Sequence, residues 1–152
     1  MRRSTALLAL SPAFLALGLP STADAAPASR VTINETLDFE NESFTFTASG
    51  PLCPSGTFED EVVKATAFQS EMRVNLTIDT VYTCDDGSGE FFVRKHVNIL
   101  DFETFTTSSG PVKFVGGTGD YDGQAGHGSD VGTDPGPPTP ATGTITGFVV
   151  HP

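Results

Sequence analysis

The fold is decided by one stretch, residues 72–99, which reads MRVNLTIDTVYTCDDGSGEFFVRKHVNI. Apolar and polar side chains alternate along its first half, and the alternation resumes after the polar turn DDGSG at 85–89. A period of two is typical of a strand with one buried face, and a short glycine-containing turn between two such strands is typical of a hairpin. The stretch therefore predicts two long antiparallel strands.

Shorter segments of the same kind extend outward from this hairpin. Glycines and prolines punctuate them, and no segment shows a convincing helical stripe. Many short strands without helices indicate an all-β domain, either a sandwich or a closed barrel. The 12 phenylalanines suit the core of either architecture, since many of them lie within the predicted strands. These strands are 31–39, 43–48, 57–68, 102–107, 112–115, 124–129 and 144–150.

Residues 132–143 (GTDPGPPTPATG) interrupt this pattern with four prolines. Proline has no N–H to donate to a neighbouring strand. We therefore expect an exposed, extended Pro/Gly-rich loop between the last two strands.

The N-terminal segment predicts export. Arg2 and Arg3 precede an apolar run at 6–19, and Ala23-Asp24-Ala25 offers the small residues that a signal peptidase reads. The run is short for a membrane span, which needs about 20 residues. We expect residues 1–25 to be a signal peptide and 26–152 to form a single domain that is secreted and extracellular.

The acidic composition, with a formal net charge of −11, argues against some partners. Nucleic acids and anionic membranes reward basic patches, so neither is expected to bind the chain after signal cleavage. Cys53 and Cys84 are the two cysteines of the chain. An even count in an oxidising compartment predicts one disulfide between them.

A glycine-rich segment, VGGTGDYDGQAGHGS at 115–129, is the most distinctive part of the sequence. It lacks the lysine and the spacing of phosphate-binding loops. Glycine tolerates positive φ and close backbone approach, so we interpret Gly116, Gly117 and Gly119 as a structural turn between two strands.

The run FVGGTGDY at 114–121, followed by the small-residue strand GQAGHG at 123–128, resembles the glycine motif of the allene oxide cyclase and dirigent barrels. The closing segment GTITGF at 143–148 fits the same pattern, and the turn at 83–89 resembles that of secreted bacterial members. The resemblance implies a small closed antiparallel barrel of about eight strands whose interior takes a small apolar or aromatic molecule. No residue matches the family's catalytic groups, so the catalytic residues stay unknown.

Polar residues of the second hairpin strand are candidate ligand-binding groups. Lys95 occupies the apolar phase, and burial inside a barrel would lower the pKa of its ammonium. The preferred alternative is a stem on apolar surface with its head in water. Arg94, His96 and Asn98 share the opposite face of the strand. If that face lines the lumen, these side chains can orient a ligand. We prefer the alternative, in which the face is a solvated outer surface.

Two tyrosines complete the candidate ligand-binding residues. Tyr82 is in phase with the core, where a hydrogen-bonded structural role is the simpler interpretation, and Tyr121 ends the glycine turn. The histidines lack metal-ligand spacing, and turns favour aspartates for backbone reasons alone. No metal and no cofactor is therefore expected; the aspartates considered were Asp120, Asp122, Asp130 and Asp134.

Three hypotheses for function follow. The leading one is a non-catalytic barrel that binds a small hydrophobic ligand in its lumen. The second is a cofactor-free cyclase or isomerase that folds a flexible substrate. The third is an extracellular interaction protein with a packed barrel.

Overall fold

The computed structural model describes residues 27–68, 73–100 and 107–151, and these form eight strands and one 3-10 turn. The predicted signal peptide, residues 1–25, lies outside them. The strands are β1 (Ser29–Asp38), β2 (Ser43–Ser49), β3 (Ser55–Phe68), β4 (Arg73–Cys84), β5 (Glu90–Leu100), β6 (Thr107–Gly117), β7 (Ala125–Thr133) and β8 (Ala141–Val150).

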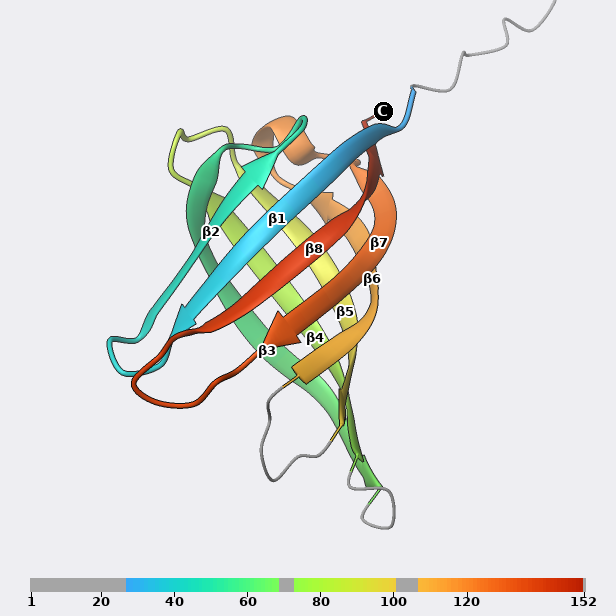
Figure 1. Ribbon diagram of the computed structural model, residues 1–152. Coiled ribbons are helices and arrows are strands. Elements are labelled where there is room, and N and C mark those ends of the chain that lie inside the picture. The colour runs from blue at the N-terminus through green and yellow to red at the C-terminus, as the bar shows by residue number, and fades with distance from the viewer. Residues whose placement is uncertain (1–26, 69–72, 101–106, 152) are drawn as a thin grey trace, which may run out of the picture.

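The strands form a closed antiparallel barrel in which each pairs with its neighbours in the sequence (Figure 1). The barrel closes where β1 pairs with β8, from Ser29 opposite Val149 to Leu37 opposite Ala141. Closure satisfies the backbone groups that a sheet edge would leave unpaired. The all-β prediction is confirmed, and of its two architectures the barrel is the one formed.

The period-two pattern decides which side chains fill the barrel. Along β8, Ile145 and Val149 point inward, while Thr144 and Phe148 between and beside them face outward. The predicted hairpin is β4–β5, with Asp79 opposite Arg94 and Tyr82 opposite Phe91. Eight strands enclose a space that side chains can fill, so burial of these alternating residues is the main stabilising contribution.

One half of the interior is filled with aromatic rings. Tyr82 and Phe91 stack with ring centroids 4.6 Å apart, and Phe46 meets both rings edge-on. Such pairs contribute roughly 0.5–1.5 kcal/mol each beyond their burial. The predicted disulfide between Cys53 and Cys84 is present and ties the β2–β3 connection to the end of β4.

Some predicted boundaries are wrong. The Pro/Gly-rich loop is shorter than 132–143, because β7 continues to Thr133 and β8 begins at Ala141. The predicted strand 112–115 is the centre of the longer β6, whose pairing with β7 tolerates Pro111 and Gly110. Of the predicted strand 102–107, residues 102–106 lie outside the described residues, and Thr107 begins β6.

The glycine segment ends in a turn as predicted, but Gly116 and Gly117 are the last residues of β6 and only Gly119 lies beyond the strand. Gly116 and Gly119 have φ of 115° and 60°, and a Cβ on Gly117 would lie 2.2 Å from the carbonyl oxygen of Glu90. The turn leads into the 3-10 turn η2 (Gly119–Tyr121), at the same end of the barrel as the β4–β5 connection (Figure 1). The hydroxyl of Tyr121 accepts a hydrogen bond from the Cys53 N–H at 2.9 Å.

Replacing Gly119 by alanine should destabilise the fold more than replacing Gly87. Both glycines have positive φ, at 60° and 77°, so both variants carry backbone strain on the order of 1 kcal/mol. Only at Gly119 would the added Cβ also lie 2.3 Å from the Ser88 carbonyl oxygen, because nothing lies within 4 Å at Gly87. Urea unfolding of both variants measures the difference; equal losses would contradict the close approach at Gly119.

Candidate functional site

A cavity of about 240 Å³ is lined by residues at the end of β1 and the start of β8. That end of the barrel is opposite the glycine turn (Figure 1). Aliphatic side chains of β1, β4 and β5 form one wall: Leu37, Leu76, Ile78, Val97 and Ile99. Strands β6, β7 and β8 line the other side with residues that include Ser108, Thr133 and Thr142. Phe39 and Asp134 line it from the β1–β2 and β7–β8 connections. Phe39 is 62% exposed, so the cavity reaches the surface at this rim.

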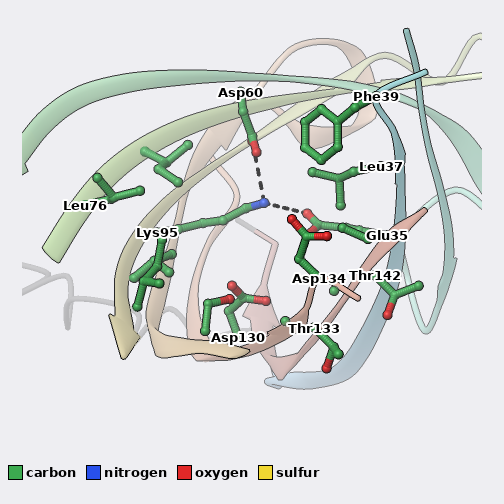
Figure 2. Close-up of a pocket in the computed structure, with 17 residues that line it drawn as sticks. Glu35, Leu37, Phe39, Asp60, Leu76, Lys95, Asp130, Thr133, Asp134 and Thr142 are labelled. Atoms are coloured by element: carbon green, nitrogen blue, oxygen red, sulfur yellow. Dashed lines mark hydrogen bonds and ion pairs between the residues drawn. The ribbon is translucent and has the colours of Figure 1, made fainter. Parts of the chain in front are cut away.

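Charged side chains form the inner boundary of the cavity (Figure 2). The Lys95 ammonium lies 2.6 Å from Glu35 Oε1 and 3.5 Å from Asp60 Oδ1. The Tyr82 hydroxyl donates a hydrogen bond to the same Glu35 oxygen. Asp60 in turn accepts a hydrogen bond from the Thr80 hydroxyl at 2.5 Å. Four different strands therefore supply one connected polar network.

The strand phase explains why these charges are inside. Glu35 follows Val31 and Ile33 on the inward face of β1, and Lys95 lies between Val93 and Val97 on that of β5. Lys95 and Glu35 are only 3% and 4% exposed. The preferred interpretation of Lys95, with its head in water, is wrong, because Glu35 supplies a partner inside the barrel.

The pKa of Lys95 is raised, whereas burial alone was expected to lower it. Desolvation does act in that direction, but attraction from Glu35 and Asp60 and the hydrogen bond to Glu35 outweigh it. The pKa of Tyr82 is well above its usual value, chiefly because it is buried and then because the Glu35 carboxylate is adjacent. Lys95 is therefore a cation and Tyr82 a neutral donor at neutral pH.

Gly143 makes room for Glu35. A Cβ at this position of β8 would lie 2.5 Å from Glu35 Oε2. The absence of a side chain on Gly143 thus lets the carboxylate sit between β1 and the cavity.

Asp130 is the least satisfied charge of the site. It lies on β7, lines the cavity and is 6% exposed, and its Oδ1 has no hydrogen-bond partner among the described residues. Burial, followed by repulsion from Glu35, raises the pKa of Asp130 to about 6 in spite of the attraction of Lys95. The interpretation of Asp130 as a turn aspartate is wrong, since it is a strand residue that faces inward.

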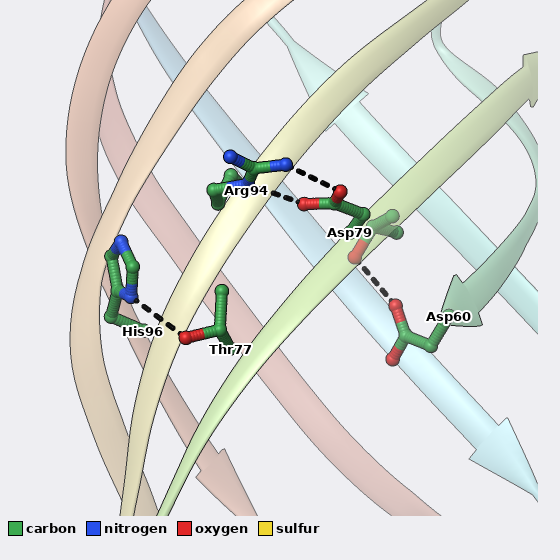
Figure 3. Close-up of polar contacts among 6 residues, drawn as sticks. Asp60, Thr77, Asp79, Arg94 and His96 are labelled. Atoms are coloured by element: carbon green, nitrogen blue, oxygen red, sulfur yellow. Dashed lines mark hydrogen bonds and ion pairs between the residues drawn. The ribbon is translucent and has the colours of Figure 1, made fainter. Parts of the chain in front are cut away.

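Arg94 and His96 lie on the outer face of β5 and do not line this cavity (Figure 3). Arg94 forms two hydrogen bonds of 2.6 Å with Asp79, which raise the pKa of Arg94 and lower that of Asp79. His96 contacts the Thr77 hydroxyl at 3.3 Å, and Asn98 is close to the Ser109 carbonyl. Exposed pairs of this kind contribute little to stability.

The other sequence candidates have structural positions. Tyr82 belongs to the network above the cavity but is not part of its lining. Tyr121 is buried at the opposite end of the barrel, where its hydroxyl contacts Cys53 and Ser88. Gly116, Gly117 and Gly119 shape the adjacent turn.

Among the described residues, the grouping of potential metal ligands consists of Cys53, Cys84 and Asp86. The two sulfurs are joined in the disulfide and offer no thiolate. These residues therefore do not make a metal site.

Glu35 and Asp60 were not among the residues expected from the sequence, and Asp130 was interpreted as a turn residue. The signal for Glu35 was present, because it stands in the apolar phase of its strand as Lys95 does. Asp60 follows Phe58 in the same way, whereas Asp130 stands among glycines and offered almost no pattern. A charged residue at an apolar position of a strand therefore indicates that an oppositely charged residue stands at such a position of another strand.

Lys95→Met should lower the free energy of unfolding by about 3–5 kcal/mol, because it leaves the Glu35 carboxylate buried without its cation. The double variant Lys95→Met/Glu35→Gln should recover part of this loss, since both charges of the pair are then absent. Urea unfolding of the wild type, the two single variants and the double variant measures the coupling. Additive losses would show that the pair does not interact.

Stability should also depend on pH through Asp130. Its pKa is about 6 in the folded state against a usual value of 3.8, so the folded state binds more protons between these values. Stability from this group is present below pH 4 and falls as pH rises through 6, by up to about 3 kcal/mol.

Asp130→Asn should abolish this contribution. The variant should match the wild type near pH 4 and exceed its stability at pH 8, because position 130 then carries no charge to bury. Urea unfolding of both proteins from pH 4 to 8 measures the difference. A variant that is less stable than the wild type at pH 8 would contradict the assignment.

Comparisons with known proteins gave no match among protein-family models, curated proteins or solved structures, so the site is interpreted from its own geometry. The resemblance to the allene oxide cyclase and dirigent barrels therefore stays a prediction. Within the described ranges, no helix is long and apolar enough to cross a membrane.

Proposed function

We propose that this protein is an exported β-barrel that binds a small, mainly apolar or aromatic molecule in its interior. The observation that carries the proposal is the cavity of about 240 Å³, which combines an aliphatic wall with a buried polar network at its inner end. Ligand sites are commonly concave and apolar, with a few convergent polar groups that fix orientation.

The size of the cavity restricts the ligand. An apolar cavity of about 150 Å³ holds benzene, whereas sites for drug-sized molecules begin near 300 Å³. The space of about 240 Å³ therefore suits a molecule with one ring, or two small fused rings, or a short branched chain.

Export is the setting in which this proposal places the protein. The basic and apolar N-terminal segment and the small residues at 23–25 support a cleaved signal peptide. The Cys53–Cys84 disulfide is compatible with an oxidising, extracellular location.

A cofactor-free cyclase or isomerase is the second candidate. The observation that favours it is Asp130, a buried carboxyl group beside the cavity with a pKa of about 6. A group with such a pKa can take up and release a proton near neutral pH, as a general acid or base must. The interaction-protein hypothesis predicts a filled interior instead, so the cavity gives it less support.

Filling the cavity should abolish binding. Ala141 is buried and lines the cavity, so Ala141→Leu places three extra carbon atoms inside it. Toluene and indole should bind the wild type, as measured by calorimetry, and Ala141→Leu should weaken both by at least about tenfold.

Thr144→Leu is the matched control, because Thr144 lies on the outer face of the same strand. It should bind both probes as the wild type does, while circular dichroism checks the fold of both variants. If neither probe binds the wild type, or if Ala141→Leu binds unchanged, the proposed function fails.

A further inference from the structure

We infer that the interior site is selective for an organic cation, a protonated amine with an apolar body, whose ammonium group is held by the side chain of Asp130. The inference rests on the proposed function, because it assigns a ligand class to the same cavity. Nothing in the sequence motifs pointed to this class.

The interior carries an excess of negative charge. Among the described residues that line the cavity, the carboxyl groups Glu35, Asp60, Asp130 and Asp134 outnumber the single ammonium of Lys95. Lys95 is already engaged by Glu35 at 2.6 Å and Asp60 at 3.5 Å. The remaining negative charge attracts a cation and repels an anionic ligand.

One carboxylate oxygen of Asp130 lacks a hydrogen-bond donor among the described residues. This oxygen, Oδ1, is buried, and the side chain lines the cavity. An ionised carboxylate only accepts hydrogen bonds, and leaving a buried acceptor unpaired is costly. A ligand ammonium brings three donors and the opposite charge, so it satisfies both needs.

The walls determine the rest of the ligand. Aliphatic side chains of β1, β4 and β5 line one side of the cavity, and Phe39 and Asp134 stand at its rim. A strongly hydrated metal ion gains nothing from such walls, and these carboxylates do not gather into a grouping of metal ligands among the described residues. An amine with a small hydrocarbon or aromatic body fits the space between these walls.

Protonation of Asp130 should couple binding to pH. The groups that face the same interior are Glu35, Asp60, Lys95, Tyr82 and Asp134. Because the pKa of Asp130 is about 6, acidification to pH 5 neutralises most of this carboxylate before a cation binds. Affinity for an amine should therefore fall by about tenfold between pH 7.5 and 5, whereas affinity for a neutral analogue should not.

The test uses benzylamine, benzyl alcohol, toluene and benzoate, which share one ring and differ in the polar group. Calorimetry on the folded, disulfide-bonded chain should show benzylamine binding at least about tenfold more tightly than toluene at pH 7.5, with benzoate the weakest. Asp130→Asn should reduce benzylamine to the level of benzyl alcohol and leave toluene unchanged. Asp79→Asn, which changes a carboxylate on the outer face, should alter none of these affinities.

The outcomes separate the two proposals. If toluene binds and benzylamine has no advantage, or if Asp130→Asn keeps that advantage, the cation inference is overturned and the proposed function stands. Equal affinities for benzyl alcohol and benzylamine overturn the cation inference, because a neutral hydrogen-bond donor on the ligand is then sufficient. If none of the probes binds, both proposals fail. The pH comparison uses the wild type alone, so it decides the inference even if the Asp130 variant does not fold.

Discussion

Inside the barrel, the ammonium of Lys95 lies 2.6 Å from the carboxylate of Glu35, and both side chains are almost completely buried. Two charges are removed from water here, which is tolerated only when each compensates the other and further hydrogen bonds complete the pair. Tyr82 provides one of these by donating to the same oxygen of Glu35. The pair divides the interior into two parts with different physical character.

On one side of the pair the interior is filled. Stacked and edge-on rings of Tyr82, Phe91 and Phe46 occupy it, and the disulfide and Tyr121 close that end. On the other side, aliphatic side chains leave a cavity that reaches solvent near Phe39. One end of the barrel therefore supplies stability, and the other has room for a molecule.

The excess of carboxylates around the pair connects stability with the proposed binding. Asp130 remains buried with one oxygen that no described residue pairs, and its raised pKa expresses the free-energy cost of ionising it there. A group that costs stability in the unliganded protein is the group that a ligand can satisfy. An uncompensated charge of this kind is a local conflict that proteins keep at functional sites, and it supports the proposed binding role.

The all-β class, the long hairpin and the disulfide could be predicted from the sequence, because they depend on local alternation and on a chain with two cysteines. The role of Gly119 could be predicted in the same way, since a tight turn requires positive φ at a residue without a side chain. Strand boundaries next to prolines were less well predicted. Strand β6 includes Pro111, because its residues on both sides of the proline pair with β7.

Closure of the sheet between β1 and β8, which lie at opposite ends of the described chain, became visible only in the folded barrel. The burial of Lys95 likewise became visible only there, because its partner Glu35 is 60 residues away and local sequence cannot identify such a contact. Alternation states that a residue shares a face with the core, but not whether that face meets water, a partner charge or a cavity. That depends on which strands close around it, and this is why the candidate site emerged from the fold.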